Sequence, residues 1–450
     1  MNSLTRIIVE QLDQSTGNVI KRSVVHEKEI TRPKVIDEIG LNYQDQTAII
    51  GKILAQFIEL QGPLINRYDK CPNCGGKLSK DGKEKCDVHT MTSDQVIEVQ
   101  RYRCRNCKWM SSNSIKSAYG TDVHTSLTKL QAELSCSHSL RKTVEILELV
   151  SSKTKRTVNN KERIKRVTAA VGGAIEKYNT MDVDSDKQNI IGASHLIVNV
   201  DGAHIRSQGD NSRSFEAMTA TIINPKDIDK SNDDRHVITN KLCVASAKSD
   251  NQETMKTMII NAAKRHGMTK DTAIVALSDG ADNCRSVIKS LSPFCGELEI
   301  ILDWFHIGMK FKNMQNLLSA DQQEKLLSAK WKLWHGLSAE CFAKVQELII
   351  EITDEKVAIK LGKLLNYLQN NKETLADYEH KKNNGMTYTS NIAESTVENM
   401  VNSRYRQSGK MQWKRDGTHA LLQIKAASFS NSLDKLWNYV FSNIYKCVAV

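Results

Sequence analysis

The sequence contains little proline and no long apolar run. Five prolines in 450 residues, without low-complexity segments or clear internal repeats, argue against repeat arrays and proline-rich linkers. No apolar run approaches the roughly 18 residues that cross a bilayer. The N-terminal stretch MNSLTRIIVEQLDQS also lacks the apolar region of a signal peptide. We therefore expect a cytoplasmic protein with no membrane partner.

What the sequence does contain is length and positive charge. A chain of 450 residues with 40% hydrophobic residues can form two to four domains with substantial cores. The net charge of +11 and the sequence pI of about 9.0 favour a polyanionic partner such as DNA. General solubility is the simpler explanation of the same charge.

Eleven cysteines in a reducing compartment favour metal binding over disulfides. Cys71 and Cys74 form one Cys-x2-Cys pair, and Cys104 and Cys107 form another. Two such pairs predict a tetrahedral zinc site with four thiolates, which is structural because no position remains open for water. The spacing between the pairs is long for a zinc ribbon, and a hairpin with a longer tip would absorb it. Cys86 and His89 fall in this expected tip and are alternative ligands or uninvolved.

Residues 121–180 have the apolar spacing of three helices, and the third is basic. This pattern favours a helix-turn-helix that binds DNA, and a helical bundle with a solvated basic face is the alternative. The side chains expected to contact phosphates or a groove are Arg156, Lys161, Arg163, Lys165 and Arg166.

From about residue 193 strands and helices alternate, which predicts an α/β fold. Three apolar strands are each followed by an aspartate: Asp201, Asp279 and Asp303. Carboxylates that follow strands lie at the carboxyl edge of a sheet, and two or three held together bind a divalent cation. Asp-Gly after a strand is also an ordinary turn signal.

A further carboxylate is expected from the stretch SNIAESTVENMVNSRYRQSG. Glu394 lies in the first turn of a predicted helix, where a negative charge is also favoured by the helix dipole. Glu398 follows four residues later on the same face. Arg404 and Arg406 come next and suit phosphate contacts.

The order VDGAH, LSDGAD, LDWFHI, SNIAES resembles the DDE transposases of bacterial insertion sequences, in particular the Kra-type family related to Mutator-like transposases. LDWFHIGMKFKNM and IAESTVENMVNSRYRQSGKMQW are among the most specific stretches. The resemblance covers about residues 195–430. It implies a ribonuclease-H-like core with a helical insertion, for which residues 318–382 are suitable.

Carried over to this sequence, the resemblance implies that Asp201, Asp279 and Glu394 are the catalytic acids and bind two Mg2+ (or Mn2+) ions. Asp303 and His306 would support the site. Asp303 is also an alternative to Asp279 as a metal ligand, and Glu398 is a weaker alternative to Glu394.

The same resemblance implies cleavage at element ends and strand transfer into target DNA, by a homo-oligomer assembled on the DNA in the bacterial nucleoid. Trp413 could stack on an unpaired base, or anchor a helix in the core. The side chains that would contact DNA in this region are Lys310, Lys312, Arg404, Arg406, Lys410 and Trp413.

The predicted architecture is a zinc-ribbon module and a helical DNA-binding segment before the ribonuclease-H-like core. Two other functions remain open: a metal-dependent nuclease or resolvase on the same core, and a non-enzymatic zinc-ribbon DNA-binding regulator. The expected segments are an N-terminal adaptor (1–69), the zinc ribbon (70–111), the helical DNA-binding domain (112–190), the first part of the core (191–317), the helical insertion (318–382) and the last part of the core with C-terminal helices (383–450).

Overall fold

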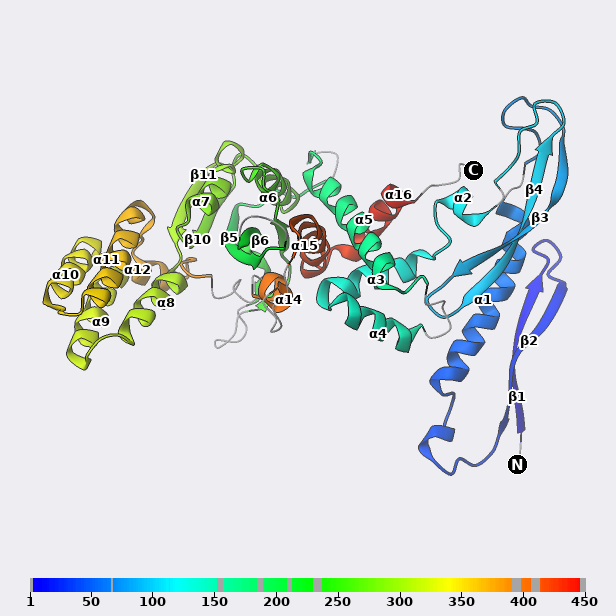
Figure 1. Cartoon of the computed structure of the whole chain (residues 1–450), viewed down its shortest axis with the longest axis horizontal. Helices are drawn as coiled ribbons and strands as arrows, with labels where there is room; N and C mark the ends of the chain where they lie inside the picture. The colour runs from blue at the N-terminus through cyan, green and yellow to red at the C-terminus, as the bar shows by residue number, and fades with distance from the viewer. Residues whose placement is uncertain are drawn as a thin grey trace. The chain divides into compact units, whose positions relative to one another are not determined.

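The structure is a computed structural model of the whole chain (Figure 1). It describes residues 3–65, 68–112, 114–151, 157–183, 189–208, 213–229, 237–390, 398–405 and 413–445. The chain forms two compact units. One comprises residues 1–168 with 439–450, and the other comprises residues 169–438.

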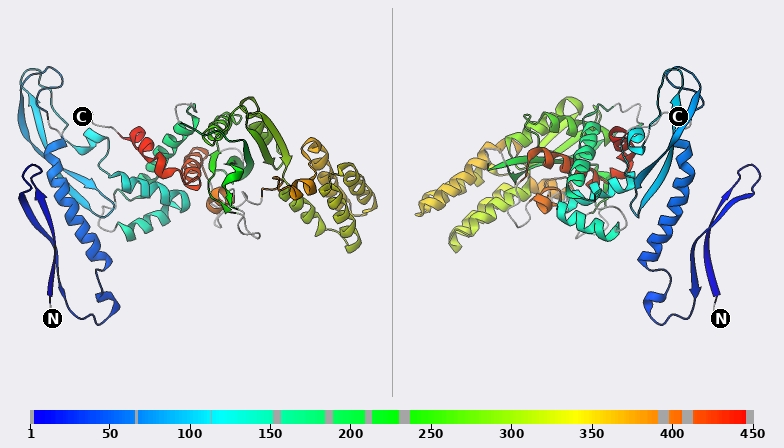
Figure 2. Two further views of the ribbon diagram at one scale, coloured as in Figure 1. Left: turned by 180° about the vertical axis from the view of Figure 1, so that it is seen from behind. Right: turned by 45° about the vertical axis from the view of Figure 1, so that its right-hand side comes forward.

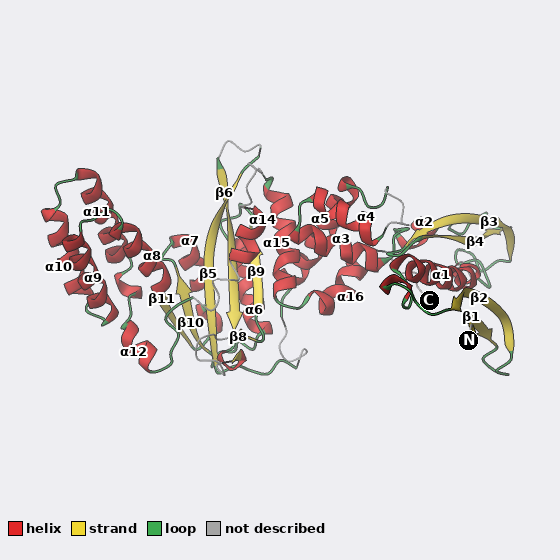
Figure 3. Ribbon diagram, turned by 90° about the horizontal axis from the view of Figure 1, so that it is seen from below, coloured by secondary structure: helices red, strands yellow, loops and turns green. Residues whose placement is uncertain are grey.

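The unit formed by residues 169–438 is a mixed α/β structure around a five-stranded sheet of order β11-β10-β5-β6-β9 (Figure 3). β10 is parallel to both β5 and β11, whereas β6 is antiparallel to β5 and to β9. The predicted α/β class is therefore confirmed at the level of a mixed sheet. The strands are β5 (His195–Arg206), β6 (Ser214–Ile223), β9 (Leu242–Ser246), β10 (Ala273–Ser278) and β11 (Glu297–Leu302).

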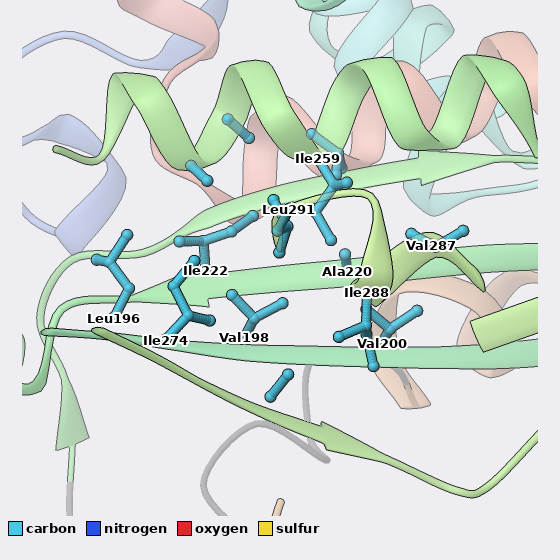
Figure 4. Packing of buried hydrophobic residues seen from close by; sticks show 14 of the residues in the cluster. Leu196, Val198, Val200, Ala220, Ile222, Ile259, Ile274, Val287, Ile288 and Leu291 are labelled. Carbon is cyan, nitrogen blue, oxygen red and sulfur yellow. The ribbon is translucent and has the colours of Figure 1, made fainter. Parts of the chain in front are cut away.

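One face of this sheet is covered by α6 (Glu253–Arg265) and α7 (Asp282–Lys289). Alternate residues of the strands point toward these helices, as the pleat requires. Val198, Ile222 and Ile274 are all at most 1% exposed there, and Ile259 and Val287 reach them from the helices (Figure 4).

Helices cover both the free edge of β9 and the opposite face of the sheet. α15 (Arg415–Phe429) packs on β9, where Gln423 Nε2 donates to the Ala245 carbonyl at 2.6 Å. Leu277 and Leu302 pack with α8 (Trp304–Gln315) and with helices from residues 320–383. These helices are α9 (Ala320–Trp334), α10 (Ser338–Glu351), α11 (Glu355–Asn370) and α12 (Tyr378–Asn383).

The C-terminal part of the chain adds a short π-helix (Glu398–Asn402), α14 (Ser403–Tyr405) and α16 (Leu433–Ile444). A small antiparallel pair, β7 (Ile228–Asp229) and β8 (Val237–Ile238), lies after β6 in the chain.

Two adjacent glycines in α5 (Lys161–Thr180) provide a matched test of this packing. A Cβ on Gly172 would lie 2.4 Å from the Ala420 carbonyl oxygen of α15, whereas a Cβ on Gly173 would meet nothing within 4 Å. We expect Gly172→Ala to destabilise the protein by about 1–3 kcal/mol through overpacking, and Gly173→Ala to stabilise it by up to about 1 kcal/mol through helix propensity. Denaturant unfolding of both variants tests this, and equal stability would contradict the close helix contact.

In the other unit, two β-hairpins and a long helix come first (Figure 2). The helix α1 packs mainly on β4, where the Gln95 amide donates to the Gly51 carbonyl at 2.9 Å. The elements are β1 (Ser3–Leu12), β2 (Val19–Ile30), α1 (Tyr43–Ile65), β3 (Leu78–His89) and β4 (Asp94–Cys104).

α1, together with the 3-10 turn before it, differs from the sequence-based expectation. The helical stretch Ile36–Ile65 is long and apolar enough to cross a membrane by length and composition, with a mean hydropathy of 1.3 over its best window. One such helix is weak evidence for a membrane span. Ile49 and Ile58 are at most 8% exposed, whereas Phe57 is 55% exposed.

Three helices follow α2 (Ile115–Tyr119). α3 (Thr125–Ser137), α4 (Leu140–Val150) and the first turns of α5 share a small core that contains Leu127, Leu147 and Ile164. Ser139 caps α4 by accepting from the Lys142 N–H, which is a standard helix start signal.

Candidate active site and metal centre

Three carboxylates occupy matching positions on the neighbouring parallel strands. Ser278, the last residue of β10, is in register with Val200 of β5 and with Leu302 of β11. The next residue along each of these strands is an aspartate. These residues are Asp201, Asp279 and Asp303.

The prediction that Asp201 ends its strand was wrong. β5 continues to Arg206, because β6 runs antiparallel beside it and pairs with residues 201–206 as far as Ser214. Of the two strands that pair with β5, only the parallel strand β10 ends here, at Ser278 opposite Val200. Asp201 therefore lies inside a strand, beside the end of the neighbouring strand.

Asp201 carries the clearest electrostatic signature of this edge. Burial raises the pKa of Asp201, and the charges of Asp279 and Asp303 raise it further, whereas His306 opposes them. Like charges in a shared, partly desolvated site favour protonation or a bound cation. The Gly202 N–H donates to Asp201 Oδ1 at 2.8 Å, and the Ala281 N–H donates to Asp279 Oδ1 at 2.9 Å.

In the described part of the chain, the acidic side chains of this edge do not form a compact cluster. Within that part, they do not form a group of three or more metal-ligating atoms within 4.8 Å of one another. Glu394, the predicted third acid, lies outside the described residues. Glu398 begins the short π-helix.

Asp303 is held by four hydrogen bonds. Its Oδ1 accepts from the N–H groups of Phe305 at 3.1 Å and Ser390 at 2.9 Å. Its Oδ2 accepts from the Ser390 hydroxyl at 2.5 Å and bonds His306 Nδ1 at 2.8 Å. Because a carboxylate offers about four lone-pair sites, Asp303 has no free site for a metal. Asp303 instead caps α8 and anchors Ser390, which lies 87 residues away in sequence.

His306 lies beside the acids, and their charges favour its protonated form. Burial alone would lower the pKa of His306, but the hydrogen bond and charge of Asp303, together with Asp201 and Asp279, raise it above 6.5. Burial would also raise the pKa of Asp303, but the bonds from His306 and Ser390 hold it below 3.8. When His306 is protonated, the two groups form a hydrogen-bonded ion pair.

This pair makes stability depend on pH. The contribution of His306 is complete below about pH 6.5 and is lost as pH rises through its raised pKa, whereas that of Asp303 is lost only when pH falls through its lowered pKa. We expect His306→Gln to lower the free energy of unfolding by about 1–3 kcal/mol at pH 6, with the difference shrinking toward pH 9. Thermal and urea unfolding without added divalent cations measure the difference.

The matched control is His335→Gln. His335 Nδ1 pairs with Glu379 Oε2 at 2.7 Å, but the two side chains are 45% and 46% exposed, so this surface pair should contribute little. A difference for His306→Gln that stays constant from pH 6 to pH 9 would contradict the ion pair.

The sequence analysis missed Glu216 of β6. Asn283 Nδ2 donates to both Glu216 carboxylate oxygens, at 2.6 and 2.5 Å. A Cβ on Gly202 would lie 2.5 Å from Glu216 Oε1, so the glycine next to Asp201 leaves room for this carboxylate. Burial, with the charges of Asp279, Asp201 and Glu216, raises the pKa of the nearby Cys284 thiol. No sequence signal marks Glu216, because its strand reads as an ordinary apolar meander strand.

α11 holds the turn that carries Asp279. The Tyr367 hydroxyl donates to the Asp279 carbonyl at 2.7 Å. Arg285 donates to the Gly280 carbonyl at 3.2 Å and to the Asn371 side chain at 2.6 Å. Gly280 has φ +89°, and a Cβ there would lie 2.7 Å from Asn371 Oδ1. The helices of residues 320–383 thus contact the acidic edge directly.

The four cysteines form the second site. Cys71 Sγ lies 3.6 Å from Cys107 Sγ, and Cys74 Sγ lies 3.5 Å from Cys104 Sγ, with all four sulfurs within 4.8 Å of one another. A tetrahedron of about 2.3 Å metal–sulfur bonds requires sulfurs about 3.8 Å apart. The cluster therefore fits a structural metal such as zinc.

The two cysteine knuckles have the same backbone geometry. Gly75 N–H donates to the Cys71 carbonyl at 2.8 Å, and Lys108 N–H donates to the Cys104 carbonyl at 3.1 Å. In each knuckle the residue after the second cysteine has a positive φ, which is +68° at Gly75 and +61° at Lys108. Left-handed backbone is uncommon for a residue such as lysine, so the second knuckle keeps this turn without a glycine.

Backbone amides support the sulfurs, but the sulfurs repel one another when ionised. The Trp109 amide lowers the pKa of Cys107 to about 6. The Gly76 amide lowers the pKa of Cys74, but the neighbouring cysteines raise it to about 12. Four thiolates at this spacing therefore require a cation.

The prediction that this hairpin has a long tip was wrong. β3 and β4 are long strands, and the turn contains only residues 90–93. Cys86 pairs with Ile97 and His89 pairs with Asp94 in the register, so both lie in β3 and outside the four-cysteine group. His89 Nδ1 bonds Asp94 Oδ1 at 2.6 Å. The spacing between the cysteine pairs is taken up by strand length.

The predicted DNA-contacting residues differ in exposure. Of the α5 residues, Lys161, Lys165 and Arg166 are exposed and Arg163 is half-buried. On α8, Lys310 and Lys312 are exposed. Arg156, Arg406 and Lys410 lie outside the described residues.

Arg404 and Trp413 pack against each other. Arg404 is 2% exposed, and its guanidinium lies 4.5 Å from the Trp413 ring centroid. Tyr405 meets the same ring edge to face at 4.8 Å. The backbone N–H of Trp413 donates to the Arg206 carbonyl at 2.9 Å, which attaches this segment to the end of β5.

The fold and the sites thus define a mixed α/β protein with an acidic sheet edge and a four-cysteine cluster that fits a structural metal. Residues 112–438 match the model of an uncharacterised protein family (UPF0236). Because the match covers more than half of the chain, the protein belongs to this family. No curated protein matches the chain.

Proposed function

We propose that this protein is a DDE transposase that cleaves DNA at insertion-sequence ends and transfers the strands into target DNA. The observation that carries the proposal is the placement of Asp201 and Asp279 at one level of neighbouring parallel strands. Their separation in sequence makes this arrangement hard to attribute to a local turn.

The mixed sheet supports a ribonuclease-H-like core. The meander β5-β6-β9 carries Asp201, and the parallel strands β10 and β11 bring Asp279 and Asp303 to the same edge. Residues 320–383 are helical between β11 and the segment that contains Glu394, as the resemblance to DDE transposases implies.

The acidic edge suits divalent cations. Asp201 and Asp279 offer hard oxygen ligands, and the raised pKa of Asp201 reflects burial and the neighbouring charge, which a cation would offset. These two carboxylates, with Glu394, would hold Mg2+ or Mn2+. Such ions supply water activation and stabilise the leaving oxygen in phosphodiester chemistry. His306 would orient Asp303 and place a positive charge beside the phosphate.

The anchor at Ser390 supports a role for Glu394. Asp303 fixes Ser390 at the end of β11 through two hydrogen bonds. Glu394 follows four residues later, and four residues span at most about 14 Å. This short separation from an anchored residue supports Glu394 as the third ligand.

DNA binding is supported by the net charge of +11 and by the exposed basic residues of α5. The four-cysteine cluster, as a structural zinc site, would stiffen a module that contacts DNA or another subunit. We further propose a homo-oligomer on DNA in the bacterial cytoplasm, because two element ends must be brought together.

The test is a cleavage and joining assay with Mg2+ or Mn2+ on DNA that carries the inverted ends flanking the gene. A transposase gives cleaved ends and joined products. Cleavage without joining would instead support a nuclease or resolvase. DNA binding without metal-dependent cleavage would support a regulator built on the four-cysteine module.

A further inference from the structure

A cavity of about 650 Å³ lies between α8 and α9. Its volume is in the range of small-ligand sites. Aromatic rings and lysines dominate its wall, and none of the described lining residues is an aspartate or glutamate. The residues that matter most are Trp304, Trp331, Trp334, Lys312, Lys330 and Lys382.

Core packing explains only part of this cluster. Trp304 and Trp334 pack against the buried Tyr378, with ring centroids 4.7 and 6.3 Å from its centroid. Trp331, in contrast, is 47% exposed and meets Trp334 edge to face at 6.1 Å. Nearly half of the Trp331 side chain is therefore open to contact with another flat ring beside Lys330.

Two lysines of the cavity, Lys330 and Lys382, contact aromatic rings rather than carboxylates. Lys330 lies 5.5 Å from the Trp304 ring and 5.7 Å from the Trp331 ring, and burial lowers its pKa. In the described part of the chain, no ion pair involves Lys312, Lys330 or Lys382. Cations held among aromatic rings without carboxylates suit a ligand that combines a flat ring with negative charge.

α8 connects this cavity to the acidic edge. His306 and Lys310 are four residues apart and share one face, where His306 bonds Asp303 and Lys310 lies 4.0 Å from the Tyr367 ring. Trp304, Gly308 and Lys312 follow the same spacing on the cavity face. Asp303 and Trp304 are consecutive, so the cavity wall begins at the residue that follows the acidic edge.

From this geometry we propose that the cavity binds one unpaired nucleotide of the DNA strand that lies at the acidic edge. The base stacks on Trp331, and Lys330, Lys312 and Lys382 neutralise the adjoining phosphates. Base–aromatic stacking tolerates any base, so the site reads the unpaired state of the nucleotide. This inference rests on the proposed function, since it requires a DNA substrate.

The experiment uses the full chain without added divalent cations, so that the DNA stays intact. The probes are a duplex with one unpaired 2-aminopurine nucleotide and the fully paired duplex. We expect the protein to quench the unpaired probe and to bind it more tightly than the paired one. Trp331→Ala should weaken binding of the unpaired probe by roughly 5- to 100-fold and leave the paired duplex unchanged.

Further variants separate stacking from charge and from misfolding. Trp331→Phe should restore most of the preference for the unpaired probe. Lys330→Gln should reduce the slope of log binding constant against log salt concentration by about one, the value for one lost phosphate contact. Lys332→Gln is the matched control, because Lys332 is on the same helix but pairs with Glu340 at 2.7 Å.

Three results would overturn the inference. If Trp331→Ala weakens paired and unpaired probes equally, or affects neither, the cavity does not bind an unpaired base. If free dAMP binds as tightly as the unpaired probe and depends on Trp331, the ligand is a free nucleotide. If wild-type protein binds no DNA at all, the proposed function fails together with this inference.

Discussion

Replacing Asp201 or Asp279 by asparagine is expected to lower the rate of metal-dependent DNA cleavage by roughly 10³-fold or more. Asparagine keeps the size of the side chain but removes the negative charge. Bound metal contributes several kcal/mol to the reaction barrier, and each 1.36 kcal/mol is about tenfold in rate. DNA binding should change by less than about twofold, because phosphate contacts come from lysines and arginines.

The same variants should not lose stability. Burial and the charge of Asp279 raise the pKa of Asp201, so the charged form is disfavoured in the free protein. A neutral asparagine side chain at either position relieves this repulsion, and thermal unfolding without divalent cations should occur at an equal or higher temperature. A residue that serves only as a turn former would give the opposite result.

Asp282→Asn is the matched control for the acids. Asp282 lies three residues after Asp279, in the first turn of α7, and is exposed. Cleavage by this variant should equal that of wild type. Full cleavage activity of Asp201→Asn or Asp279→Asn would remove the basis of the proposed enzyme.

Replacing Cys104 by serine is expected to abolish the metal site. Structural zinc in small modules carries about 10–16 kcal/mol of apparent binding free energy at neutral pH, so loss of one ligand should reduce zinc content from about one ion per chain to near zero. Residues 68–112 should then become sensitive to limited proteolysis. Zinc content by mass spectrometry and the digestion pattern measure both effects.

Cys86→Ser provides the comparison within the same hairpin. Cys86 is half-buried in β3 but lies outside the four-cysteine group, so zinc content and protease resistance should be retained. Zinc loss in Cys86→Ser, or full zinc content in Cys104→Ser, would contradict the assigned ligands.

Local patterns in the sequence were sufficient to locate the main elements. The apolar stretches at 196–200, 274–277 and 298–302 fall in β5, β10 and β11, because buried strands need continuous apolar residues. The two Cys-x2-Cys pairs identified the metal cluster for a similar reason, since each pair is complete within one turn.

Features that depend on distant partners could not be predicted. β5 continues beyond Asp201 because β6 pairs with it there, and an antiparallel partner leaves no mark at Asp201 itself. The anchoring of Ser390 by Asp303 and the contact of Asn283 with Glu216 join residues 87 and 67 positions apart. The length of β3 also could not be predicted, because β3 continues through a register shift between Lys80 and Lys83 that its pairing with β4 maintains.

The hairpin β3–β4 is fastened at both ends. The cysteine cluster closes one end, and at the other end the His89 N–H donates to the Asp122 carbonyl while the His89 carbonyl accepts from the His124 N–H, each at 2.8 Å. The hairpin is therefore held in place at both ends. Loss of metal would remove the contacts at the cysteine end only, and the backbone hydrogen bonds of His89 would remain. Local unfolding would begin at the cysteine knuckles. All the pairing between β3 and β4 would have to be lost before the start of α3 was affected.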